Sequence, residues 1–156
     1  MKGKEKLRKE LIVSAIENGT VIDHIPSDSV FQVIRILDLE DCGSQLLFGT
    51  NLDSKKYGKK GIIKVREKFF KSGEINKIAL AAPTATLIVI KDFEVVEKKQ
   101  VKIPDSVEGI VKCFNPNCIT NHEQIVTKFK VLDKNNLKLL CHYCEKITDS
   151  NNINFI

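Results

Sequence analysis

Two cysteine pairs decide the fold of the C-terminal third of the chain: CFNPNC at residues 113–118 and CHYC at residues 141–144. Twenty-two residues lie between the pairs. Each pair frames a tight turn, and the Asn and Pro residues inside the first pair favour such a turn. Four thiolates on two turns can converge on one tetrahedral ion, and sulfur ligands favour zinc over calcium or magnesium. The predicted ligands of one structural zinc ion per chain are Cys113, Cys118, Cys141 and Cys144.

A zinc ion with four protein ligands leaves no position open for water or substrate, so the predicted site stabilises the fold and does not catalyse. A segment of about 50 residues cannot bury enough apolar surface to fold alone, so the metal would supply much of its folding free energy. Two reactive dithiols or disulfides are the alternative, which the odd total of five cysteines disfavours. Cys42 has no nearby partner in the sequence. His122 and His142 are spare ligand candidates, and His142 is expected to point away from the metal.

The first hundred residues carry the patterns of a different, mixed fold. Apolar residues at 30, 33, 34 and 37 recur at helical spacing, as do those at 75, 78 and 79. Ser27 or Ser29 is expected to cap the first helix, and Ser72 the second. β-branched and alternating runs predict strands between and beyond these helices. The expected strands span residues 20–25, 45–51, 61–67, 85–91 and 93–97, with a turn at 53–60.

The order of these elements is strand, helix, strand, strand, helix, strand, with one further strand, which is typical of ferredoxin-like folds. The fold class predicted is therefore α+β. An N-terminal ferredoxin-like antiparallel sheet with two helices on one face is followed by a small C-terminal β-rich zinc-binding domain. Residues 1–12 are expected to form an arm, residues 97–106 a linker, and residues 149–156 a polar end that is either disordered or docked. The predicted domains are 1–102 and 103–156.

Composition limits the classes of function. The net charge of +5 is a mild basic excess, weaker than the concentrated charge of most nucleic-acid binders. No stretch of about 18 uncharged apolar residues occurs, so neither a membrane span nor binding to a membrane is expected. The first residues lack the uninterrupted apolar region of a secretory signal, which predicts a cytoplasmic location.

Four segments of the chain resemble the regulatory chain of aspartate carbamoyltransferase, in matching order and spacing. The resemblance extends over residues 11–146, and its zinc-site spacing is unusual. The segments are GTVIDHIP at 19–26, GKKGIIKV at 58–65, LAAPTATLIVIKDFEVVEK at 80–98, and CFNPNC with CHYCEK at 113–146.

The resemblance implies a specific function. It implies an N-terminal allosteric domain that forms a homodimer, and a C-terminal zinc domain that contacts the catalytic chain and so bridges catalytic trimers. CTP, often with UTP, would inhibit the holoenzyme and ATP would activate it, in pyrimidine biosynthesis. The chain itself would not be an enzyme, and it would bind neither nucleic acid nor membrane.

The resemblance also implies a nucleotide site. Asp23 would accept hydrogen bonds from ribose hydroxyls, Lys98 and His24 would meet the phosphates, and Lys64 would reach the ribose and base. Lys60 matches a further family lysine near the ribose and phosphates. Backbone groups near Ala15, Ile16 and Phe93 would contact the edge of the base. The expected apolar walls are Val13, Val21, Ile62, Ile90 and Val95.

Two positions depart from the family pattern. Ile88 stands where an Asn helps to contact the phosphates, so a polar donor is lost, and Phe93 stands where a Tyr is familiar. These departures bear on the effector response and not on the fold, and an assembly-only subunit without effector control is one alternative.

A zinc-ribbon nucleic-acid-binding protein is another alternative, although the cysteine region lacks a dense Lys/Arg stripe with aromatic residues between. An enzyme is a third alternative. It is disfavoured because no motif of nucleophile, base and orienting group and no glycine-rich phosphate loop is present.

Overall fold

The computed structural model describes residues 15–156. Predictions placed on residues 1–14, which are the N-terminal arm and Val13, lie outside the described residues. The chain forms two compact units that divide between Lys102 and Ile103. Within the described part, none of the helices combines the length and apolarity needed to cross a bilayer.

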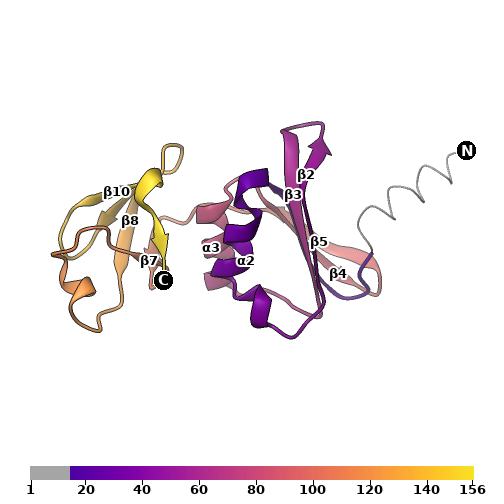
Figure 1. Cartoon of the computed structure of the whole chain (residues 1–156), viewed down its shortest axis with the longest axis horizontal. Coiled ribbons are helices and arrows are strands. Elements are labelled where there is room, and N and C mark those ends of the chain that lie inside the picture. The colour runs from indigo at the N-terminus through magenta and orange to yellow at the C-terminus, as the bar shows by residue number, and fades with distance from the viewer. Residues whose placement is uncertain (1–14) are drawn as a thin grey trace, which may run out of the picture. The chain divides into compact units, whose positions relative to one another are not determined.

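The first unit is built on a five-stranded antiparallel sheet in the order β2-β3-β1-β4-β5 (Figure 1). Its first four strands have the ferredoxin-like order, and β5 is added beside β4. The α+β, antiparallel fold class predicted from the sequence is confirmed. The strands are β1 (Gly19–Ile25), β2 (Leu46–Ser54), β3 (Gly58–Arg66), β4 (Thr86–Lys91) and β5 (Glu94–Gln100).

Two helices, α2 (Val30–Ile36) and α3 (Ser72–Ala81), cover one face of this sheet (Figure 1). Short 3-10 turns at Ser27–Ser29 and Leu39–Asp41 flank α2. The apolar stripes predicted for the helices face the strands, and the core between them is fully buried. Its most buried side chains include Ile22, Ile25, Val30, Val33, Ile63, Val65 and Ile78.

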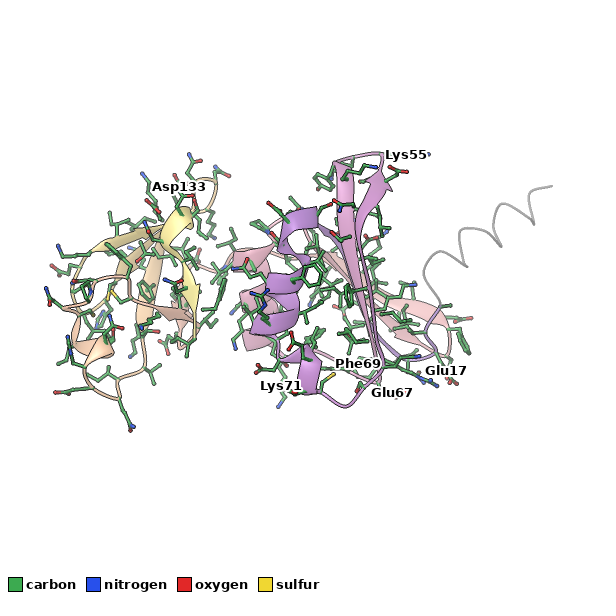
Figure 2. The ribbon with its side chains drawn as sticks, in the orientation of Figure 1. Glu17, Lys55, Glu67, Phe69, Lys71 and Asp133 are labelled. Atoms are coloured by element: carbon green, nitrogen blue, oxygen red, sulfur yellow. The ribbon has the colours of Figure 1, made fainter. Side chains whose placement is uncertain are left out.

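The predicted ends of several strands in the first unit are wrong. The turn expected over 53–60 is only residues 55–57, because β2 and β3 extend into a long hairpin with Lys55 at its end (Figure 2). The strand expected to end at residue 97 continues to Gln100, so the linker is shorter than predicted. The extensions were not predicted because their side chains are polar. A strand at the edge of a sheet or at the end of a hairpin is exposed to water and needs no alternation of apolar and polar residues.

The predicted helix caps are also corrected. Ser29 is the N-cap of α2 but makes no capping hydrogen bond with its side chain. Ser72 is the first residue of α3 and not its cap; the Glu74 carboxylate instead accepts from the Lys71 backbone N–H at 3.3 Å. This bond satisfies one of the donors left unpaired where a helix begins.

The face of the sheet away from the helices carries a second, smaller apolar cluster. Ile16, Val21 and Ile62 are buried there, and Leu52, Ile88 and Ile90 pack against them half-buried. Ile16 precedes β1, so the segment that enters the sheet also covers part of this open face. The backbone N–H of Phe93 donates to the Glu17 carbonyl at 2.9 Å, which ties that segment to the β4–β5 hairpin.

The second unit is small and β-rich, with a four-stranded sheet in the order β10-β9-β8-β6 and a two-stranded pair β11-β7. The end of the chain, left open by the sequence between disorder and docking, is ordered because β11 pairs with β7. The strands are β6 (Ser106–Glu108), β7 (Val111–Lys112), β8 (Lys128–Asp133), β9 (Lys138–Cys141), β10 (Ile147–Asp149) and β11 (Asn154–Phe155), with 3-10 turns η3 (Ile119–Asn121) and η4 (Ser150–Asn152).

Candidate functional site

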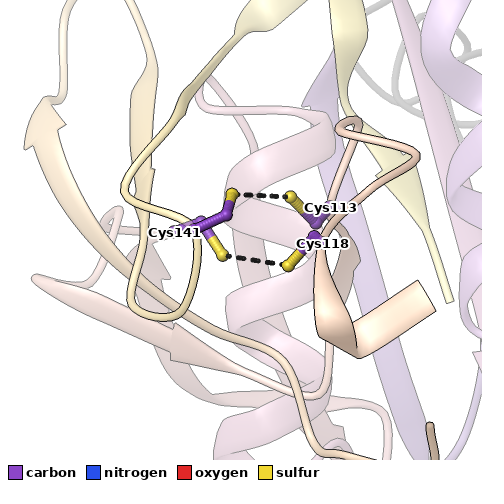
Figure 3. Close-up of side chains that lie close together, drawn as sticks. Cys113, Cys118 and Cys141 are labelled. Carbon is purple, nitrogen blue, oxygen red and sulfur yellow. Dashed lines mark hydrogen bonds between the residues drawn. The ribbon is translucent and has the colours of Figure 1, made fainter. Parts of the chain in front are cut away.

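The four cysteines of the two pairs lie together in the second unit. All four Sγ atoms lie within 4.8 Å of one another, and the side chains of three of the four are buried. Cys113 and Cys144 have their sulfurs 3.7 Å apart, and Cys118 and Cys141 have theirs 3.8 Å apart (Figure 3). Each close approach joins the two pairs, so the sulfurs face inward from both turns.

The sulfur separations fit a tetrahedral metal site. Four sulfurs at about 2.3 Å from a zinc ion lie about 3.8 Å from one another, which is the spacing of the two contacts above. A disulfide would need about 2.05 Å, and all five cysteines of the chain are free thiols. His122 and His142 take no part in the cluster: the His122 ring bonds to the Pro116 carbonyl, and the His142 ring packs edge-on against Tyr143.

The second pair is shaped by its own backbone. Cys141 ends β9, and Glu145 takes a left-handed backbone conformation with φ 60°, which turns the chain back. The Cys141 N–H donates to the Lys146 carbonyl and the Glu145 N–H to the Cys141 carbonyl, both at 3.0 Å. The His142 N–H donates to the Lys128 carbonyl of β8 at 2.9 Å, so the turn is closed by its own backbone and fixed to the neighbouring strand.

The environment of the thiols differs from one cysteine to another. Burial raises the pKa values of Cys113 and Cys141, because the charged thiolate is disfavoured away from water. Burial also acts to raise the pKa of Cys144, but hydrogen bonds from the Lys146 backbone and the Asn115 side chain outweigh it and lower the value to about 7. A cation bound among the sulfurs would displace the remaining protons, since thiolates are the ligands.

A second candidate site lies on the open face of the first unit. Strand register places Val21 opposite Lys64 of β3 on one side and opposite Ile88 of β4 on the other. Ile88 in turn lies opposite Lys98 of β5. Residues directly opposite in neighbouring strands share a face, so Lys64 and Lys98 face the same side with two apolar residues between them.

A β-bulge at the end of β1 completes this face. Two residues of β1, Asp23 and His24, lie opposite the single residue Ile62 of β3. The extra residue is accommodated because His24 takes a left-handed backbone conformation with φ 56°. Asp23 Oδ1 accepts from the His24 N–H at 2.6 Å and from the Lys60 Nζ at 2.8 Å.

Charge is concentrated around Asp23. Its carboxylate and the Lys60 ammonium are mostly sheltered, with 16% and 21% of their side-chain surfaces exposed. Lys64 lies four residues beyond Lys60 on β3. Burial lowers the pKa of Lys64, and the nearby Asp23 charge partly offsets this. The arrangement holds more positive than negative charge, which suits an anionic ligand.

His24 is held on both sides. Its Nδ1 lies 3.0 Å from the Thr86 Oγ1, and its carbonyl accepts from the Thr84 hydroxyl at 2.7 Å. Its ring also meets the Tyr57 ring edge-on, with centroids 5.8 Å apart. Thr86 was not singled out by sequence reasoning; the pairing of Asp23 with Thr86 that brings it here appears only from the strand register.

The remaining predicted contacts are spread along this face. Ile16 and Ile62 are buried in its apolar cluster and Ile90 packs against them, while Ala15 is exposed beside them. Phe93 and Val95, in and after the turn of the β4–β5 hairpin, are largely exposed. The predicted lysines Lys64 and Lys98 therefore share the open face of the sheet, whereas Phe93 and Val95 lie exposed at the β4–β5 hairpin. Val13 lies outside the described residues.

A cavity of about 830 Å³ opens beside His24, but it is a different feature. Among its walls are Pro26 and Ser27 directly after β1, Phe31 of α2 and Asn51 of β2. Lys60, Lys64 and Lys98 do not line it. The cross-strand row, and not the cavity, marks the candidate site, because the row collects the cations on one face of the sheet.

Both units match models of one protein family. Residues 11–102 match the model described as aspartate carbamoyltransferase regulatory chain, allosteric domain, and residues 105–154 match the model of its metal binding domain.

Relatives with the name "Aspartate carbamoyltransferase regulatory chain" are similar over most of their length. That of Bacteroides fragilis is 55% identical over 139 residues, which is 89% of this chain and 91% of the relative. That of Thermococcus sibiricus is 54% identical over 143 residues, 92% of this chain and 95% of the relative. That of Pyrococcus horikoshii is 53% identical over 146 residues, which is 92% of this chain and 96% of the relative. The chain therefore belongs to the family of aspartate carbamoyltransferase regulatory chains.

Proposed function

We propose that this chain is a non-catalytic regulatory subunit of aspartate carbamoyltransferase in pyrimidine biosynthesis. It binds nucleotides on the open face of its sheet, binds one zinc ion through its four cysteines, and docks on the catalytic chain through the cysteine domain. The observation that carries the proposal is that one chain combines a sheet face with lysines gathered around Asp23 and a four-sulfur site of tetrahedral spacing. Membership of the family, shown for both units, supports the same function.

The nucleotide would lie across the row formed by Lys64, Val21, Ile88 and Lys98. Lys98 and His24 are proposed to meet the phosphates. Lys60 is proposed to lie near the ribose and phosphates, and Lys64 to reach the ribose and base. Asp23 would accept from ribose hydroxyls, which requires it to share or release Lys60. CTP and UTP are the proposed inhibitors and ATP the proposed activator. Backbone groups near Ala15, Ile16 and Phe93 would read the base.

Ile88 favours a second candidate function. It lies in the centre of the row, half-buried against Val21 and Ile62, so this part of the floor offers no hydrogen bond to a phosphate. An assembly-only subunit, which bridges catalytic trimers without responding to nucleotides, would tolerate such a change. The two functions differ in whether nucleotides alter the catalytic response.

The free edge of the sheet at β2 is the surface proposed for dimerisation. β2 is an outer strand, and Phe48 on it packs edge-on against Phe31 of α2, with ring centroids 5.6 Å apart. Both rings are about half exposed. A second copy pairing along β2 would cover them and extend the sheet. The other edge, β5, carries mainly charged residues, which protect an edge strand from pairing.

Regulation requires that a nucleotide binds one quaternary state of the holoenzyme more tightly than the other. Coupling of about 1–3 kcal/mol is usual, which corresponds to changes of roughly 5- to 150-fold in affinity. A cytoplasmic location is part of the proposal, since thiolate ligands persist in a reducing compartment.

The test is to mix the zinc-loaded chain with its cognate catalytic trimer. Assembly would be measured by analytical ultracentrifugation, and aspartate saturation with and without ATP, CTP and UTP. A larger complex whose saturation curve shifts with nucleotides is expected. A complex whose saturation curve does not change with nucleotides would support the assembly-only function. Absence of any complex would contradict both proposed functions. Carbamoyl transfer by the isolated chain would contradict the non-catalytic assignment.

A further inference from the structure

The first cysteine pair poses a structural problem that the second does not. Four residues separate Cys113 from Cys118, against two between Cys141 and Cys144. A wider turn has more backbone carbonyls to satisfy and more ways to fold, so it needs additional bonds to hold its two sulfurs in place. Asn115, in the middle of this turn, is almost fully buried, at 9% exposed.

Part of the turn is closed by bonds within it. The Cys118 N–H donates to the Asn115 carbonyl at 3.0 Å. The Asn117 N–H donates to the Asn115 Oδ1 at 3.1 Å, which leaves the Asn115 amide nitrogen to donate elsewhere. These bonds bring Cys118 back toward the middle of the turn, but they do not reach its start at Cys113.

Asn121 adds a connection to the Cys113 backbone from outside the turn. Its side-chain Nδ2 donates to the Cys113 carbonyl at 3.0 Å and to the Asn115 carbonyl at 2.7 Å. The 3-10 turn η3 begins directly after Cys118 and carries Asn121 back over the loop, and the Asn121 N–H donates to the Cys118 carbonyl at 2.9 Å. One residue thus bonds to the start, the middle and the end of the turn.

His122 adds a parallel bond. Its Nε2 lies 2.8 Å from the Pro116 carbonyl, which can only accept, so Nε2 carries the proton. The His122 side chain is exposed, whereas that of Asn121 is half-buried. The contribution of the buried amide should therefore be the larger of the two, because water can replace the outer bond.

The residue held by Asn121 touches the sulfurs of both pairs. The Asn115 backbone N–H is hydrogen-bonded to Cys113, and its side chain is hydrogen-bonded to Cys144. Displacement of Asn115 would consequently disturb one sulfur from each turn. Outer residues that hold metal ligands in this manner commonly set how tightly the metal is kept.

We infer that Asn121 is a positioning residue for the metal, which locks the wide cysteine turn through the Cys113 and Asn115 carbonyls. The inference rests on the proposal that the four cysteines bind zinc. It assigns to Asn121 control over the rate of metal loss and over ligand geometry, beyond a general contribution to folding.

The test uses the full-length, zinc-loaded chain and the variants Asn121→Ala and Asn121→Asp. Asn121→Asp keeps the shape of the side chain but turns an acceptor toward the two carbonyls. Zinc transfer to a chromogenic chelator should become about 10- to 100-fold faster in both variants. Asn117→Ala is the matched control: it lies in the same turn, its side chain is exposed and its backbone bond is kept, so its rate should equal that of the unmodified chain.

A second readout separates positioning from general stabilisation. Cobalt(II) substituted for zinc reports ligand geometry through its visible absorption, and both Asn121 variants should shift these bands while Asn117→Ala does not. If either variant does not fold without metal, its cobalt affinity is measured by competition with a chelator, which remains possible when folding and binding are coupled. Asn121 variants with the control's release rate, affinity and spectrum would overturn the inference. An unmodified chain that binds no stoichiometric zinc would instead overturn the zinc proposal itself.

Discussion

Lys98 and Lys99 are neighbours in β5 but face opposite sides of the sheet. Lys98 lies opposite Ile88 on the open face, whereas Lys99 lies opposite Leu87, whose side chain is buried under the helices. Lys98→Gln is expected to weaken ATP and CTP binding by about 1.5–3 kcal/mol, roughly 10- to 150-fold in Kd, because a charged hydrogen bond to phosphate is lost. Isothermal titration calorimetry on the full chain measures this. Lys99→Gln should bind as the unmodified chain does, and equal losses in both variants would contradict the site.

Lys64 makes a prediction about pH. Burial lowers its pKa below the ordinary value of 10.5, and the Asp23 charge acts in the opposite direction. Lys64 donates charged hydrogen bonds to a nucleotide only in its ammonium form, which is lost as pH rises through the pKa of the folded state. Its loss should therefore begin at lower pH than for an exposed lysine. Asp23→Asn should lower the pKa of Lys64 further, measured by NMR titration of its Nζ resonance. A value that is unchanged or raised would show that Asp23 does not support the Lys64 charge.

At the scale of elements, α2 packs so closely on β3 that only glycine fits at position 61. A Cβ added at Gly61 would collide with the Val30 side chain. Gly61→Ala should push α2 off the sheet and lower the free energy of unfolding by about 1–3 kcal/mol, in the range of overpacked cores. Urea denaturation measures the change. Gly73→Ala in α3 is the control, because a Cβ there meets no atom within 4 Å; a loss of similar size in the control would argue against the packing explanation.

The two edges of the sheet give a prediction about dimerisation. Phe48→Lys on β2 should shift the isolated chain toward monomer, because a charge would be buried where the second copy is proposed to pair. Val96→Lys places the same charge on β5, at a residue that is also about half exposed. Sedimentation velocity at several concentrations compares the two. A dimer weakened by Val96→Lys and unaffected by Phe48→Lys would move the interface to the opposite edge.

For the whole molecule, the metal should matter to one domain only. Removal of zinc by a strong chelator or a mercurial should unfold residues 107–148, since a structural zinc contributes about 10–16 kcal/mol of apparent binding free energy in small domains. The first domain has its own buried apolar core of strand and helix residues and should remain folded. Hydrogen exchange with mass spectrometry follows both domains at once. Unchanged exchange in residues 107–148, or equal loss of protection in both domains, would contradict the prediction.

The four-cysteine set and the order of strands and helices were determined by the sequence alone. Both depend on spacing between near neighbours: turn residues between paired cysteines, and apolar residues at periods of 3.6 or 2. The polar hairpin ends were not predicted, and for residues 149–156 the sequence left disorder and docking open. Both segments are stabilised by hydrogen bonds to other strands and carry little periodic signal.

Only the tertiary structure decided which distant residues meet. The row from Lys64 through Val21 and Ile88 to Lys98 depends on the register of four strands, and a shift by one residue in any of them would turn its side chains to the other face. The resemblance to known regulatory chains implied those residues, but spacing along the chain did not. The contact of Asn121 with Cys113 is of the same kind. It forms because the chain turns back on itself after Cys118, and no local sequence pattern predicts which carbonyls a side-chain amide will bond to.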